Sequence, residues 1–100
     1  MATLNELSFS KSDTNGRYES TAVQVAGDFG LSLVFSDSIT EEVNAKILQS
    51  IDGENYEDVA IISFTPAVQP SIQRNVTGIA DGAYIVISST DEPTSGGILA

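Results

Sequence analysis

The sequence predicts an all-β protein, an antiparallel β-sandwich (Ig-like or jelly-roll-like) with seven or eight strands. β-Branched residues dominate the apolar set, and glycines separate the apolar runs. Short alternating runs recur at intervals of roughly ten residues, a spacing typical of an antiparallel sandwich or barrel. We expect a sandwich of two packed sheets.

The segment 1–18 is polar and weakly patterned, and we predict an arm or an edge element there, followed by a sandwich domain over 19–100. The strand candidates after it are "STAVQVAG" (20–27), "LSLVFS" (31–36), "VNAKILQS" (43–50), "YEDVAIISF" (56–64), "SIQRNV" (71–76) and "AYIVISS" (83–89). Their alternation predicts a core of Val23, Val25, Leu31, Leu33, Phe35, Val43, Ile47, Val59, Ile61, Tyr84 and Val86.

A helix is the alternative for "TEEVNAKILQSI" (40–51), because Thr40 followed by Glu41 and Glu42 resembles a helix N-terminus. The strand is favoured, since apolar Val43 alternates with polar neighbours along this segment.

Two runs, "VAII" (59–62) and "YIVI" (84–87), are apolar on both faces of their predicted strands. A two-sheet sandwich of this size buries one face of each strand, so the other face needs a cover. The N-terminal arm, the C-terminal "ILA" or a partner protein could supply it. If a partner does, Ile62 and Ile85 are the candidate outward residues for protein contact.

The composition excludes several kinds of chemistry. The chain has no cysteine and no histidine, which removes disulfides, thiolate metal sites and the usual Ser-His-Asp and Cys-His arrangements. The net charge is −10, which disfavours nucleic acid and anionic membranes as partners. We expect no enzymatic activity and no cofactor.

The acidic stretch "QSIDGENYEDV" (49–59) does not match a calcium-binding loop, because Glu57 stands where an EF-hand loop starting at Asp52 needs glycine. Asp52-Gly53 is instead a strong hairpin-turn pair. We predict an exposed hairpin tip without a metal ion or a catalytic carboxylate.

Three segments together carry a family resemblance. "VQVAGDFG" provides Val23, Val25, Gly27, Phe29 and Gly30; "LQSIDGENYEDV" provides Gln49, Ser50, Asp52, Gly53, Asn55 and Tyr56; "NVTGIADGAYIVIS" provides Val76, Thr77, Gly78, Tyr84 and Ile85. Residues 21–95 thereby resemble small β-sandwich structural proteins, auxiliary or decoration proteins, of tailed bacteriophage virions. Val86 departs from the pattern, which often has arginine there.

The resemblance implies a non-enzymatic decoration protein that bridges capsid subunits. It implies the virion surface as location, synthesis in the host cytoplasm, and the major capsid protein or another virion protein as partner. The N-terminus lacks the pattern of a secretory signal. We expect a homo-oligomer, with a trimer preferred. The alternatives are a carbohydrate-binding or adhesive sandwich module and a tail or neck component.

Overall fold

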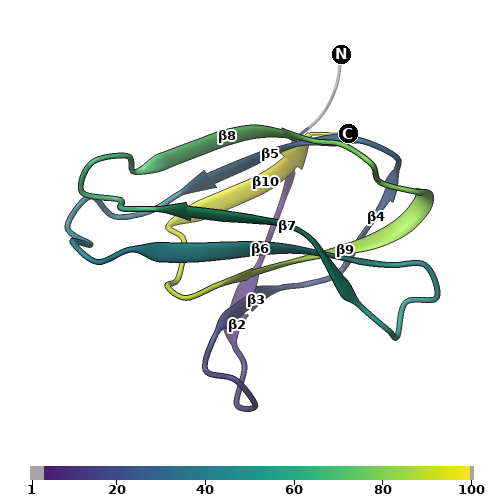
Figure 1. Cartoon of the computed structure of the whole chain (residues 1–100), viewed down its shortest axis with the longest axis horizontal. Helices are drawn as coiled ribbons and strands as arrows, with labels where there is room; N and C mark the ends of the chain where they lie inside the picture. Colours follow the sequence, from purple (N-terminus) through teal and green to yellow (C-terminus); the bar gives the residue numbers. More distant parts are fainter. Residues whose placement is uncertain (1–3, 100) are drawn as a thin grey trace.

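The computed structural model describes residues 4–99 and confirms an all-β sandwich of two antiparallel sheets (Figure 1). It has ten strands, not seven or eight, because short strands at both chain ends were not counted. The strands are β1 (Leu4–Glu6), β2 (Phe9–Lys11), β3 (Tyr18–Ser20), β4 (Val23–Ala26), β5 (Phe29–Val34), β6 (Val43–Ser50), β7 (Glu57–Phe64), β8 (Ser71–Val76), β9 (Asp81–Ser89) and β10 (Ser95–Leu99). No helix that could span a membrane occurs within the described residues.

The four-stranded sheet has the order β1-β10-β5-β8. Its β10 contains Gly96 and Gly97, although glycine pairs are more usual in turns. Here a Cβ on Gly96 would lie 2.9 Å from Leu33 Cδ2, and one on Gly97 would lie 2.8 Å from Leu4 Cδ1. Side chains of Leu33 and Leu4 thus occupy the space that a Cβ would need, which explains why these two strand positions hold glycine.

The six-stranded sheet has the order β2-β3-β9-β6-β7, and β4 also pairs with β9. The short strands β3 and β4 lie along the same edge of β9, β3 opposite its last residues and β4 opposite its first. The sequence predicted one strand over 20–27, which covers β4 but only the last residue of β3. The segment that was a possible helix is strand β6, which confirms the alternating pattern.

The N-terminal segment contributes an edge strand to each sheet. β1 pairs with β10, and β2 pairs with β3. The chain therefore crosses from one sheet to the other near Leu7, which is buried. Figure 1 shows the β2–β3 hairpin extending below the rest of the molecule in that view.

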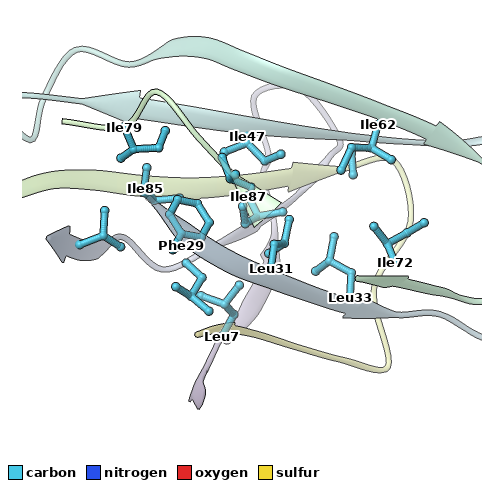
Figure 2. Close-up of a cluster of buried hydrophobic side chains, with 14 of the residues drawn as sticks. Leu7, Phe29, Leu31, Leu33, Ile47, Ile62, Ile72, Ile79, Ile85 and Ile87 are labelled. Atoms are coloured by element: carbon cyan, nitrogen blue, oxygen red, sulfur yellow. The ribbon is translucent and has the colours of Figure 1, made fainter. Parts of the chain in front are cut away.

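Side chains from both sheets meet in one core between them (Figure 2). Six predicted core residues are buried there: Val25, Leu31, Leu33, Phe35, Val43 and Ile47. Val23 and Val59 pack against this core while partly exposed. The sequence missed several fully buried contributors, among them Ile72, Ile87 and Ile98.

Three predicted core residues face the wrong way, and so do both predicted contact residues. Ile61 is 55 % exposed, whereas Ile62 is 8 % exposed and Ile85 fully buried. Tyr84 and Val86 lie on the outer face of β9, since they alternate with Ile85 and Ile87 in the core. The proposed outward orientation of Ile62 and Ile85 is therefore wrong, and neither side chain offers a docking surface.

Candidate functional site

The acidic loop between β6 and β7 is an exposed hairpin tip, as predicted. Hydrogen bonds among its own residues fix its shape. The backbone N–H groups of Asn55 and Glu54 donate to Asp52 Oδ1 at 2.9 and 2.8 Å. The Asn55 side-chain amide donates to Asp52 Oδ2 at 2.8 Å, and Ser50 Oγ donates to Oδ1 at 2.9 Å. Gly53, with φ of 80°, completes the turn by donating its N–H to Ser50 Oγ.

These hydrogen bonds, led by those from the backbone of Asn55 and Glu54, hold the pKa of the Asp52 carboxyl well below its usual range. A carboxylate held ionised in this way is a poor general acid or base near neutral pH. Within residues 4–99, no group of three acidic, histidine or cysteine side chains is close enough to hold a metal ion. The loop geometry fits a structural turn.

We expect Asp52→Asn to lower the melting temperature at neutral pH, because the folded state favours the ionised carboxylate. A depressed pKa gives stability that is complete above the unfolded pKa, about 3.9, and is lost as the pH falls below it. The difference between wild type and Asp52→Asn should therefore narrow below about pH 4. Thermal melts from neutral to acidic pH check this, with Glu54→Gln as a control for charge removal on the same loop. A difference that stays constant with pH would contradict the role of Asp52.

A depression of about 510 Å3 lies beside this loop, lined by Gln49, Ile51, Asp52, Asn55, Tyr56 and Glu57. An aromatic ring beside amides and carboxylates resembles the contents of a sugar site. Here, however, both Asp52 oxygens already accept hydrogen bonds, and Gln49 Oε1 accepts one from the backbone N–H of Ala80 at 2.8 Å. Asp52, the Asn55 amide nitrogen and Gln49 Oε1 are thus engaged in holding the loop together, which leaves fewer polar groups for a sugar.

The outer face of the six-stranded sheet is covered in part by the chain itself. The Tyr84 ring lies against Gly53, where an added Cβ would be 3.4 Å from Tyr84 Cε2. At the other end of β9, the Arg17 guanidinium donates to Ser88 Oγ and Ser88 O, and also to Asn44 O and Oδ1, at 2.8–3.1 Å. The acidic loop thus covers Tyr84, and Arg17 of the β2–β3 hairpin lies over Ser88, just past the second apolar run, whereas Ile61 stays exposed.

The outer face of the four-stranded sheet carries little charge. Its residues follow from the strand register and from the burial of their alternate neighbours. We call this surface the neutral face; it consists of Leu4, Glu6, Gly30, Ser32, Val34, Ser71, Gln73, Asn75, Ser95, Gly97 and Leu99. Only Glu6 is charged, although the chain as a whole has fourteen acidic residues.

The centre of the neutral face is hollowed. A depression of about 510 Å3 is lined by Leu4 and Leu99 on one side and by Gln73 and Asn75 on the other, with Gly30, Leu31 and Ser32 between them. Arg74, on the edge strand β8, also lines it and is the one charged residue among those described that does so. The two leucines are about half exposed. Gln73 Nε2 donates to Ser32 Oγ and Ser71 Oγ at 2.9 Å, which fixes the amide along the edge strand.

The acidic residues lie mainly at the two ends of the sandwich. The β5–β6 and β9–β10 loops share one end, and they contain Asp37, Glu41, Glu42, Asp91 and Glu92 (Figure 1, left). The β6–β7 and β8–β9 loops share the opposite end, with Asp52 and Glu54 in the first of them (Figure 1, right). The neutral face lies between these two acidic ends.

Sequence reasoning missed the neutral face, because three of its four strands are short, glycine-rich or polar. One signal was available: the polar and small residues of "GLS" and "SIQRN" alternate with apolar ones and carry no acid. The fold defines a two-sheet antiparallel β-sandwich. No protein-family model matches the chain, and no curated protein is significantly similar to it.

Proposed function

We propose that the protein is a non-enzymatic structural protein of a tailed-bacteriophage virion, a capsid auxiliary or decoration protein that bridges capsid subunits. The neutral face is the observation that carries this proposal. Protein interfaces are depleted of charge at their centre, because a charge buried without a partner costs several kcal/mol. In a chain of net charge −10, this face is where another protein surface can approach at least cost.

The neutral face also suits close approach. Gly30, Gly97, Ser32 and Ser95 present little side chain, so a partner can lie near the sheet backbone. Leu4 and Leu99 offer exposed apolar area beside the depression. With this face docked, the acidic ends remain in solvent, and their mutual repulsion opposes association of particles.

The partner in this proposal is the major capsid protein or another virion protein. The proposal includes a homo-oligomer, for which a trimer was preferred from the sequence. The alternative is a tail or neck component, which would use the same kind of docking face. The number of copies per virion distinguishes it from a capsid protein.

Two added carboxylates on the neutral face should weaken binding to capsids assembled without the protein. The double variant Gln73→Glu/Asn75→Asp changes shape little, and both side chains are exposed. We expect binding in a co-sedimentation assay to fall about tenfold or more, since one tenfold step needs only about 1.4 kcal/mol. Gln69→Glu, in the exposed loop before β8, is the matched control and should bind like wild type. Equal binding by the double variant and wild type would refute docking through this face.

A further inference from the structure

Strand β7 is an edge strand without the protection that the other edge strands have, among them the four-residue β4. Within residues 4–99 it is hydrogen-bonded only to β6. The edges β1 and β2 are three residues long, and β8 has exposed Gln73, Arg74 and Asn75 in succession. Short length and polar or charged side chains are the usual means of blocking unwanted strand pairing. β7 is eight residues long and mostly apolar.

Within β7 itself the protective features are confined to its start, and Arg74 of β8 lines a depression beside Val59–Ile62. Glu57 and Asp58 come first, and Val59 is the extra residue of a β-bulge, since Ile47 pairs with Ala60 and Leu48 with Asp58. The remaining stretch, "AIISF" (60–64), is regular and has no charge and no proline. Ile61 in its middle is 55 % exposed on the outer face of the sheet. An uncharged edge segment with high β-propensity readily pairs with another strand.

We propose that a second copy of the chain covers this edge, with the two β7 strands pairing antiparallel about a two-fold axis near Ile62. In this register residue 60 of one copy lies opposite residue 64 of the other, so only the uncharged stretch is paired. Glu57 and Asp58 of each copy then lie beyond Phe64 of the other copy, outside the paired stretch. Parallel pairing would instead place Glu57 beside Glu57 and Asp58 beside Asp58, which like-charge repulsion opposes.

The pairing has structural consequences that can be measured. It joins the two six-stranded sheets into one and places Ile61 opposite Ser63 of the second copy on the outer face. Both edges are used by the same two-fold contact, so the assembly closes as a dimer. Each copy has a net charge of −10, and added salt should therefore strengthen association by screening the repulsion. The inference does not depend on a virion role.

Light scattering coupled to size-exclusion chromatography of the full chain, from low to high micromolar concentration, tests the proposal. We expect the mass of a dimer, and slow hydrogen exchange at the amides of 60–64 that depends on protein concentration. Ile61→Lys should weaken dimerisation about tenfold or more, since it places a charge in the paired edge. Val68→Lys makes a similar change at an 86 % exposed residue outside β7 and should leave the dimer intact.

If Ile61→Lys does not fold, Ser63→Lys tests the same edge, because Ser63 is exposed on the same outer face. A monomer at high micromolar concentration overturns the proposal, and so does a trimer or dimer that neither lysine variant weakens. A monomer that still binds capsids would remove this proposal and the expected homo-oligomer, and leave docking on capsid subunits through the neutral face standing. If the chain forms a β7-paired dimer but is absent from virions, the proposed function is refuted and the dimer proposal stands.

Discussion

Ile85→Ala should lower the free energy of unfolding by about 2–5 kcal/mol, whereas Ile61→Ala should cost less than about 1 kcal/mol. The two substitutions remove the same atoms from two strands of one sheet, β9 and β7, which lie on either side of β6. Ile85 is fully buried between the sheets, so alanine leaves a cavity as well as losing apolar contact (Figure 2). Ile61 is more than half exposed, so little buried area is lost.

Equilibrium urea denaturation of both variants gives the two values. It should be done at a protein concentration low enough for monomers, because Ile61 also lies in the proposed dimer contact. In thermal melts, a loss of 3 kcal/mol in a domain of this size corresponds to roughly 12–24 °C. If Ile61→Ala proved the more damaging variant, the assignment of the inner and outer faces of β7 and β9 would be wrong.

Arg17→Ala should destabilise the protein by about 1–3 kcal/mol, and it should also loosen the β2–β3 hairpin. The Arg17 guanidinium makes four hydrogen bonds to Asn44 and Ser88, and these connect the hairpin to the ends of β6 and β9. Hydrogen bonds from a charged donor are stronger than neutral ones, and the removal of Arg17 leaves partly buried acceptors without it. The hairpin also meets the sheet through the short pairing of β3 with β9 and through Ser20 Oγ, which accepts a hydrogen bond from the Ile87 backbone N–H at 2.8 Å.

Hydrogen exchange and thermal melts together measure this effect. The amides of Phe9–Lys11 and Tyr18–Ser20 should exchange faster in Arg17→Ala than in wild type, while those of β6 change less. Lys11→Ala is the control, because Lys11 is an exposed cation on the same hairpin. Equal melting temperatures for Arg17→Ala and Lys11→Ala would show that the guanidinium does not anchor the hairpin.

The sequence predicted the sandwich and most of its long strands, but it assigned the wrong faces where both faces are apolar. In β5, Ser32 alternates with leucines and identifies the outer face, and the predicted core was correct there. In "VAII" and "YIVI" no polar residue marks a face. The informative residues were Ser63 and Ser88, just past each run: if they face outward, Ile62 and Ile85 must face inward. The bulge at Val59 further disturbed the alternation in β7.

The short strands were missed for a different reason. β10 contains "SGG", which normally predicts a turn, and its pairing depends on Leu4 and Leu33, which are distant in sequence and cover the two glycines. β1 depends in turn on β10. Such tertiary contacts leave no local pattern, so the neutral face that these strands help to form could not be assembled from the sequence.

The resemblance to phage decoration proteins rests on residues that the fold places in strands and at the turns between them. Gly27, Gly53 and Gly78 all have positive φ values, from 78° to 122°, and Val25 and Phe29 are core residues. These positions serve the sandwich itself. The neutral face, by contrast, contains only Gly30 of the matched residues, so it supports the docking proposal independently of the resemblance.

Quantitative mass spectrometry of purified virions, from a phage whose genome encodes this chain, tests the central proposal most directly. A decoration protein should be present in each particle at a copy number comparable to that of the major capsid protein, and it should remain on capsids separated from tails. Absence of the chain from purified virions would contradict a structural role. A few copies per particle that stay with the tail fraction would contradict the capsid role in favour of a tail or neck component.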